Sequence, residues 1–568
     1  MLNSVIEKTL VKVLAAGSAF ITVFIVVGPV ADPVNISKFL AAGTLSFGIA
    51  ALLIRGGFKS MWSENRFFFG AIGLFVALSL LCAMTSAAPF VQNFYGEAGR
   101  NTGFLTYFFL SLFALGSAAL SNAEGFKKIL YAFFVAGIIN LAYGLWAWQI
   151  GDFVAWTNIY GNLLGTFGNP NFMGAFLGMF GTAILAFAAG PGKSWKLRLV
   201  AGLLWVLTFL EIIQTSAVQG LVLITGGMAL VGFYLLRSLT KDFKLPSLYL
   251  IAVSILGVVA VAGALQKGPL AAYIYKRSVS LRGNYWHTAI NMGIDHPFTG
   301  VGMDAYGTYF REYRTLSAAT DMPGPETISN AAHNVVLDFF AYGGFPLLFS
   351  YLFMVGLAGL AILKVSKRTK QYDPIFVALA AIWICYQVQS IISINQLGLA
   401  IWGWMLSGLM VAYERTTRAT SVDLAITSGS KKSAKKKKAD PVVAAGLIAS
   451  TGMALGLLVA LPPFTADYKY LHAINGGDLV KLESALQPNY FNPVNIYKLV
   501  NAVDILERSN LSDQAIIYAR KAVEFSPLEY DAWKVLFRAT KSTPSEKAQA
   551  KQKMIELDPL NKANKELP

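Results

Sequence analysis

The stretch Lys276-Arg277-Ser278-Val279-Ser280-Leu281-Arg282-Gly283-Asn284-Tyr285-Trp286 lies inside the long polar interruption of a hydrophobic chain, residues 266–333. Apolar runs of membrane-spanning length lie on both sides of it. The interruption holds three of the four histidines, and it ends at His333-Asn334, directly before the next apolar run. The sequence therefore gathers its candidate chemistry in one large loop between membrane spans.

Composition points to a membrane protein. The chain has 568 residues, of which 55% are hydrophobic and 14% charged, and its mean hydropathy is +0.53. Soluble domains carry about 25% charged residues, and a helix needs about 20 apolar residues to cross a bilayer. We expect an all-α, polytopic protein with about 13 transmembrane helices. The spans are predicted at 11–30, 37–54, 67–87, 103–120, 127–150, 170–190, 198–214, 217–236, 247–265, 334–363, 374–393, 397–413 and 441–461.

Lysine and arginine alternate between successive loops, which predicts the orientation. Arg55, Lys127, Arg198, Arg237 and Lys364 mark the loops assigned to the cytoplasm. The N-terminus is then cytoplasmic and residues 266–333 lie outside, as expected in a bacterial plasma membrane. The net charge of +16 fits cytoplasmic loops of this kind and needs no nucleic-acid partner.

The chain divides into four parts. Residues 1–413 form the membrane domain. Residues 414–440 form a basic cytoplasmic linker that contacts anionic lipid. Residues 441–461 form the last span, which ends at Pro462-Pro463. Residues 464–568 form an extracytoplasmic helical domain. Pro527 and Pro559 repeat at a spacing near the period of tetratricopeptide helix pairs. An ordinary helical bundle is the alternative, and either form suits docking or packing, including a protein partner.

Arg282 is the leading candidate for binding an anion. An arginine near a membrane surface can pair with the oxygens of a pyrophosphate in a bidentate manner. Lys276 and Arg277 either assist it or contact lipid head groups. Tyr285 and Trp286 either stack on sugar rings or lie at the membrane interface.

His333, beside Asn334 at the start of a span, can titrate near neutral pH. It either takes a proton from an acceptor hydroxyl or binds phosphate as a cation. The three loop histidines match no familiar zinc spacing. Between them, Gly300-Val301-Gly302 predicts a tight turn, and Arg311 and Arg314 are expected on an exposed helix, paired with Glu312.

Two other polar turns are predicted on the same side of the membrane. Gly168-Asn169-Pro170-Asn171 precedes the sixth span, and Arg100 lies in a glycine-rich turn before the fourth. Asn169 and Arg100 therefore join the candidate substrate-binding residues. Cys82 and Cys385 both lie in apolar runs and indicate neither a disulfide nor a metal site.

Together these motifs resemble the O-antigen ligase and polymerase superfamily over about residues 60–415. The resemblance rests on Gly168-Asn169-Pro170-Asn171, Arg282, Pro297 with Gly300-Val301-Gly302, and His333-Asn334 followed by Gly343-Gly344. It implies a fold like that of the membrane glycosyltransferases of this group, with Arg282 as the essential loop arginine and His333 as the essential histidine. Proteins that resemble this group also carry tetratricopeptide-like domains.

One position departs from the family pattern. Ligases often have an arginine after the serine in the turn between spans seven and eight, where this chain reads Gln214-Thr215-Ser216-Ala217-Val218-Gln219-Gly220. Either Gln219 or Arg100 replaces that arginine, or the substrate is held differently. A ligase acting strictly on lipid A-core is therefore doubtful.

The resemblance implies a transferase that moves a glycan from undecaprenyl pyrophosphate to an acceptor hydroxyl on a glycan, lipid or protein. No cofactor or metal is expected, because arginine supplies the positive charge. A glycan polymerase and a protein O-oligosaccharyltransferase are alternatives within the superfamily. A flippase of anionic lipid-linked polymers is the alternative of another class, which predicts charges inside the spans and broken helices.

Overall fold

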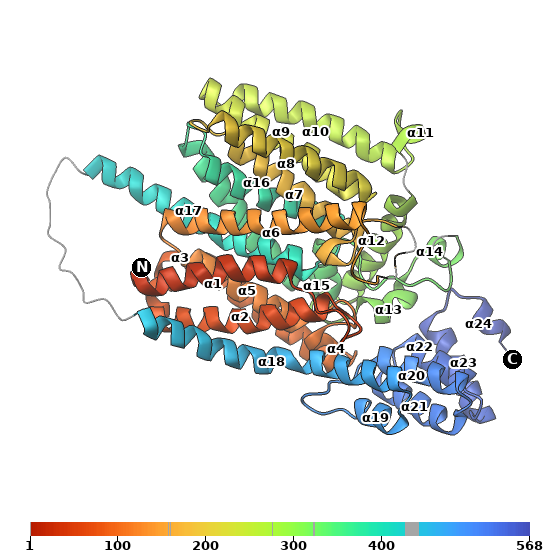
Figure 1. Ribbon diagram of the computed structural model, residues 1–568. Helices are drawn as coiled ribbons and strands as arrows, with labels where there is room; N and C mark the ends of the chain where they lie inside the picture. Colours follow the sequence, from red (N-terminus) through yellow and green to blue (C-terminus); the bar gives the residue numbers. More distant parts are fainter. Residues whose placement is uncertain are drawn as a thin grey trace.

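The computed structural model describes residues 2–156, 158, 161–274, 277–321, 324–426 and 442–567. All regular secondary structure formed by these residues is helical, and no β-strand occurs among them. The long helices lie side by side in a bundle, and the C-terminal helices lie at one end of it (Figure 1). The predicted all-α membrane architecture is confirmed.

Ten helices of the described ranges are long and apolar enough to cross a bilayer. They are α2 (Asn35–Gly56), α3 (Phe58–Thr85), α6 (Ala123–Gln149), α7 (Pro170–Ala188), α8 (Trp195–Gln214), α9 (Val218–Thr240), α10 (Lys244–Ala264), α15 (Val335–Arg368), α17 (Leu397–Ile426) and α18 (Val442–Gly476). Two shorter apolar helices are α5 (Phe104–Ala118) and α16 (Pro374–Ser390). The chain is a multi-pass membrane protein. Each predicted span falls on one of these helices or on α1 (Ser4–Val23), and the number that cross the bilayer stays a prediction.

Helix α1 ends at Val23, before the end of its predicted span. Lys38 of α2 closes this end, because its Nζ donates to the carbonyl oxygens of Ile21, Thr22 and Phe24 at 3.1, 2.6 and 3.2 Å. The Lys38 residue is 0% exposed. A lysine near the start of α2 therefore satisfies the last carbonyl groups of α1.

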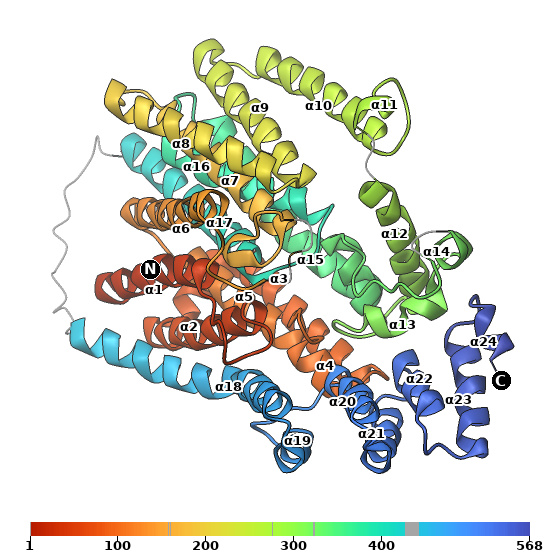
Figure 2. The ribbon, with the colours of Figure 1, turned by 45° about the vertical axis from the view of Figure 1, so that its right-hand side comes forward.

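The segment predicted as a polar loop contains four helices. These are α11 (Ala271–Ile274), α12 (Arg277–Asp295), α13 (Tyr306–Tyr313) and α14 (Leu316–Thr320). Helix α12 packs against α15, and these helices lie at the same end of the bundle as the C-terminal helices (Figure 2). The short α4 (Phe90–Tyr95) and the 3₁₀ turn η1 (Gly165–Phe167) precede α5 and α7. The segment between α10 and α15 is thus largely helical rather than an open loop.

Helix α15 is broken at Gly343-Gly344, where the sequence predicts tilt or a break. Gly343 has φ −148° and ψ 19°, and Gly344 has φ 60° and ψ −158°. A Cβ on Gly344 would collide with the carbonyl oxygen of Pro297. Only glycine combines this backbone conformation with so close an approach of another segment.

Residues 297–302 bind the backbone groups that the break exposes. Val301 N–H donates to Ala341 O (2.8 Å), Gly302 N–H donates to Tyr342 O (3.1 Å), and Phe345 N–H donates to Pro297 O (2.8 Å). Unpaired backbone groups inside a membrane protein cost several kcal/mol each. The turn predicted at Gly300-Val301-Gly302 therefore supplies hydrogen-bond partners to the backbone of α15 at its break.

Helix α18 passes through Pro462-Pro463, where the last span was predicted to end. Pro462 has no N–H for the carbonyl of Leu458, and the hydroxyl of Tyr490 donates to that carbonyl at 3.4 Å. The prolines are tolerated because a C-terminal residue replaces a missing donor. The helix thus connects the membrane domain rigidly to the C-terminal helices.

The C-terminal helices have a hydrophobic core of their own. They are α19 (Leu479–Ala485), α20 (Ile496–Arg508), α21 (Ser512–Phe525), α22 (Tyr530–Arg538), α23 (Pro544–Leu557) and α24 (Ala563–Glu566). Helix α20 packs on α21 and α22 on α23, as successive helix pairs. Their tetratricopeptide character remains a prediction.

The predicted linker, residues 414–440, begins within α17. Arg415 donates to the carbonyl oxygens of Ala118 and Leu120 at 3.1 and 2.6 Å, so the helix is held beyond residue 413. Residues 427–441, which include the lysine run, lie outside the described residues.

Substituting Gly344→Ala should destabilise the protein, because an L residue at φ 60° is strained and its Cβ meets backbone. The cost expected is about 1–3 kcal/mol, seen as a lower melting temperature of the detergent-purified protein. Gly356→Ala in the same helix is the control, since nothing lies within 4 Å of a Cβ there. Equal melting temperatures for the two variants would contradict the role assigned to the break.

Candidate functional site

His333 lies in a tight turn that ends against α15. Its φ is +54°, in the left-handed region. Asn334 caps α15, since its Oδ1 accepts the N–H groups of Val336 and Leu337 at 3.0 and 3.2 Å. Asp338, one turn into the helix, accepts the N–H of Ala332 at 2.7 Å through Oδ1. The histidine is therefore held by a cap on one side and a carboxylate on the other.

Tyr285 of α12 stacks on the His333 ring, with 5.5 Å between centroids and 28° between planes. The Tyr285 carbonyl accepts the hydroxyl of Tyr306 at 2.8 Å. The ring predicted to stack on sugar thus stacks on the histidine, which fixes α12 beside it. Arg282 lies one helical turn before Tyr285, so α12 brings Arg282 to the same place.

Two arginines act on His333. The pKa of His333 is lowered to about 4, first by burial, then by repulsion from Arg282 and from Arg100. Burial also lowers the pKa of the Arg282 guanidinium, while Tyr285 counteracts this shift. Segments far apart in sequence thus place two cations around one imidazole, which is neutral at physiological pH.

Arg100 is positioned by a carboxylate that the sequence analysis did not single out. Asp304 accepts hydrogen bonds from the N–H groups of Glu97 and Thr102 at 2.8 and 3.1 Å, and from the Thr102 hydroxyl at 2.9 Å. These bonds close the turn of residues 96–103. Arg100 Nε in turn donates to Asn330 Oδ1 at 3.2 Å, three residues before His333.

The surroundings of the two arginines differ in charge. Burial raises the pKa of Glu97 and of Asp304, and Arg100 nearby counteracts both shifts. Arg282 forms no ion pair with any carboxylate in the part of the chain that the structure describes. Arg100 forms no ion pair within the described ranges either, but two acids lie near enough to act on it, whereas no described acid acts on Arg282.

A cavity of about 450 Å³ opens beside Arg100. Its lining includes Arg100, Asn330 and Asn169, and Asn169 caps α7 by accepting the Asn171 N–H at 2.9 Å. The predicted residues Arg100 and Asn169 therefore share one pocket. Arg282 and His333 do not line this cavity.

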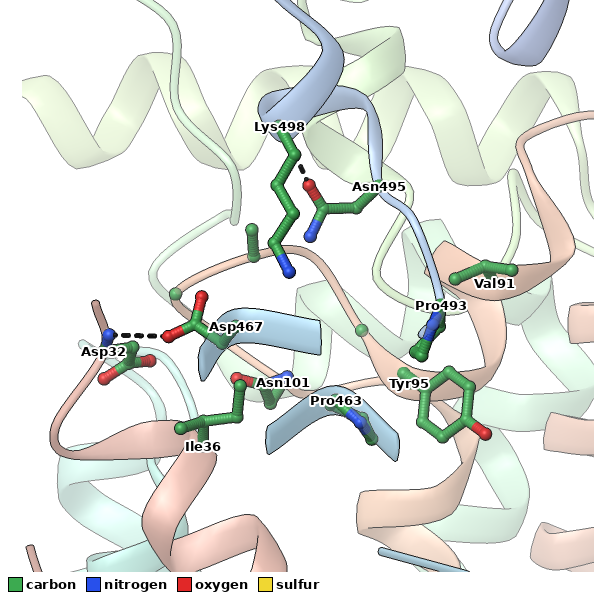
Figure 3. Close-up of a pocket in the computed structure, with 13 residues that line it drawn as sticks. Asp32, Ile36, Val91, Tyr95, Asn101, Pro463, Asp467, Pro493, Asn495 and Lys498 are labelled. Carbon is green, nitrogen blue, oxygen red and sulfur yellow. Dashed lines mark hydrogen bonds between the residues drawn. The ribbon is translucent and has the colours of Figure 1, made fainter. Parts of the chain in front are cut away.

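A second, smaller cavity of about 40 Å³ lies where the C-terminal helices meet the membrane domain. Figure 3 shows Lys498, Asp467 and Asp32 around it. Burial lowers the pKa of Lys498 to about 8, and Asp467 counteracts the shift. Asp32 and Gly99 line both cavities, so the two cavities are adjacent at these residues.

Residues 172–352 match the O-antigen ligase family. This matched region contains Arg282, His333 and the part of α15 that includes the break at Gly343-Gly344. Arg100 and Asn169 lie before it. The resemblance drawn from the sequence is confirmed there, and the match supports a membrane glycan ligase or polymerase type of function. A search of curated proteins finds no significant match to the chain.

The remaining predicted residues do not join the site. Gln219 is buried near the start of α9, its Oε1 has no partner among the described residues, and it lines neither of the two cavities described above. Lys276 lies outside the described residues, as does the side chain of Arg277. Trp286 Nε1 is buried without a partner within the described ranges. Of the two replacements considered for the missing ligase arginine, Arg100 lies near enough to His333 to lower its pKa.

The prediction for Arg311 and Arg314 was wrong. Their side chains are 6% and 0% exposed, and both pair with Asp558, itself 0% exposed, at 3.1 and 2.6 Å. Arg311 also lies over the Tyr530 ring at 4.2 Å. Asp558 follows α23, so the C-terminal helices dock on the segment between α10 and α15, which also contains Arg282 and His333.

No group of three or more His, Cys, Asp or Glu side chains that could hold a metal ion occurs among the described residues. The residues missed by sequence reasoning are Asp304, Asp338 and Asn330. Asp304 follows the predicted turn by two residues and Asp338 lies five residues after His333, but their partners are distant in sequence.

The variant Asp558→Ala should release the C-terminal helices from α13, because it leaves Arg311 and Arg314 buried without a counter-charge. Breaking a buried ion pair on one side costs about 3–5 kcal/mol. Hydrogen exchange should show faster exchange in residues 306–313 and 544–557.

Lys481→Ala is the control for that measurement, since Lys481 pairs with Asp478 in an exposed bridge of the C-terminal helices that lies outside both segments. It should leave exchange in both segments unchanged. If Asp558→Ala also left exchange unchanged, the docking contact would not depend on this ion pair.

Proposed function

We propose that the chain transfers a glycan from undecaprenyl pyrophosphate to an acceptor hydroxyl. This proposal rests on the position of His333, where both Arg282 and Arg100 repel the cationic form of its imidazole. A pyrophosphate needs concentrated positive charge, and a leaving group needs that charge to be already in place. The ligase-family match over both Arg282 and His333 supports the same activity.

In the proposed reaction the acceptor oxygen attacks the anomeric carbon of the donor sugar. The bond from that carbon to the pyrophosphate oxygen breaks, with inversion, and undecaprenyl pyrophosphate leaves. Arg282, which no described carboxylate compensates, stabilises the charge on the departing pyrophosphate. Neutral His333 accepts the proton of the acceptor hydroxyl and passes it to water.

The lowered pKa of His333 favours a role as a general base rather than as a permanent cation. In the free protein the imidazole is neutral because its pKa is about 4. A pyrophosphate bound to Arg282 offsets the repulsion from that arginine and raises this pKa, so the base becomes stronger when the donor is present. Tyr285 stacks on the ring, and Asp338 holds the backbone of Ala332 just before it.

A glycan polymerase fits the same geometry, since it differs from a ligase only in the acceptor. The flippase alternative is weaker, because the break in α15 is locked by hydrogen bonds from residues 297–302. The proposed setting is the outer face of a bacterial plasma membrane, with the C-terminal helices on that side.

The variants Arg282→Ala and His333→Ala should each lower glycan transfer at least about 100-fold, as loss of one transition-state contact does. The assay uses purified protein with undecaprenyl-pyrophosphate-linked glycan and a scan of acceptors. His287→Ala on the same helix is the control, because His287 is exposed and bonds only to the Gly283 carbonyl. Full transfer by correctly inserted Arg282→Ala or His333→Ala protein would refute the proposed site.

The pH dependence provides a separate test. Because the pKa of His333 is lowered to about 4 in the free protein, kcat/KM should stay level as pH falls from about 7.5 to about 5.5. The kcat value reports the donor complex, in which the pKa of His333 is higher. As the pH is lowered, kcat should therefore begin to fall at a higher pH than kcat/KM does. A fall in kcat/KM with a midpoint near the ordinary histidine value of about 6.5 would contradict a buried His333 flanked by cations.

A further inference from the structure

The cavity beside Arg100 has chemistry of its own that the reaction above does not use. Its volume of about 450 Å³ lies within the range of small-molecule sites, about 300–1,000 Å³. Five parts of the chain line it: the turn before α2, the turn of residues 96–103, Trp156, the turn and first residues of α7, and Asn330. Its walls combine amide and charged groups with the aromatic rings of Trp156, Phe167 and Phe172.

Three of its polar groups have unused hydrogen-bonding capacity among the described residues. Asp32 accepts the N–H groups of Val34 and Asn35 through Oδ1, but its buried Oδ2 has no partner. Arg100 uses only Nε, on Asn330, which leaves both Nη groups. Asn169 uses its oxygen as a helix cap, and its amide N–H groups have no partner in the described ranges.

This set of groups does not suit a phosphate. Asp32 lines the cavity, and its Oδ2 has no partner among the described residues. Glu97 and Asp304 also lie close enough to interact with Arg100. Acids around a single guanidinium repel an anion, so the pyrophosphate belongs on the side of Arg282.

A ligand with hydroxyl groups satisfies the same set. A hydroxyl donates to Asp32 Oδ2 and accepts from Arg100 Nη or Asn169 Nδ2. An aromatic side chain such as Trp156 offers a flat apolar face to the carbon atoms of a ring. We propose that this pocket, lined by Asp32, Arg100 and Asn169, binds a neutral sugar ring of the glycan substrate.

This inference rests on the proposed function and extends it by dividing the substrate between two places. Arg282, on which no described acid acts, takes the pyrophosphate, and the pocket of Arg100, which has acids nearby, takes the sugar. Asn330 links the two, because it contacts Arg100 and precedes His333 by three residues. The ring comes from either the donor or the acceptor, and the two sources share this chemistry.

Saturation-transfer NMR with the full-length protein in detergent tests the proposal, with glucose, galactose and N-acetylglucosamine as probes. At least one sugar should show saturation transfer, and Asp32→Asn and Asn169→Ser should each reduce it at least fivefold. Serine keeps the helix cap and removes the amide donors. Asn122→Ser is the matched control, because Asn122 caps α6 in the same way and lies outside the pocket.

Two further arms separate the possible sources. Undecaprenyl pyrophosphate without sugar should leave the signal intact. Displacement by undecaprenyl pyrophosphate carrying N-acetylglucosamine would identify the donor ring, and persistence of the signal would identify the acceptor ring.

The proposal is overturned if no sugar gives a signal, if the pocket variants match Asn122→Ser, or if inorganic pyrophosphate displaces the sugar from the wild type but not from Arg100→Gln. Failure of the proposed transfer function is distinguishable, because it would appear as full transfer by Arg282→Ala or His333→Ala. Neither of those variants enters the sugar titration.

Discussion

The rest of the structure depends on the interruption of α15 at Gly343-Gly344. A helix broken inside a membrane protein must find new partners for its backbone groups, and residues 297–302 provide them. Because this turn is fixed, Asp304 just after it reaches the turn of residues 96–103. The same helix begins directly after His333. One backbone defect therefore positions both the histidine and the segment that holds Arg100.

Around that centre the charges are arranged unequally. Arg282 is half-buried near Tyr285, whereas Arg100 lies near the acids Glu97 and Asp304. In a site with little water, an uncompensated guanidinium attracts an anion strongly and a compensated one does not. A substrate that joins a pyrophosphate to a sugar has the same two halves, which is why the proposed transfer and the proposed sugar pocket agree.

The C-terminal helices are part of this arrangement. Asp558 neutralises two arginines of the outer segment, and Glu529 accepts the hydroxyl of Thr308 at 3.1 Å. Gln92 bonds both to Thr308 and to the Asp304 carbonyl, at 3.2 and 3.1 Å. A chain of contacts therefore connects the C-terminal helices to the turn that carries Arg100.

The sequence alone determined the apolar helices, the break at Gly343-Gly344 and the choice of Arg282, His333, Arg100 and Asn169, because hydropathy, paired glycines and cations beside spans are local signals. It did not show that Lys38 caps a helix, that Arg311 and Arg314 are buried on Asp558, or that Asp304 holds a distant turn. Those roles depend on partners that lie up to hundreds of residues away, and a side chain's charge says nothing about which partner will reach it. Only the tertiary structure decides which cations are compensated, and that distinction separates a residue that stabilises the fold from one free to bind substrate.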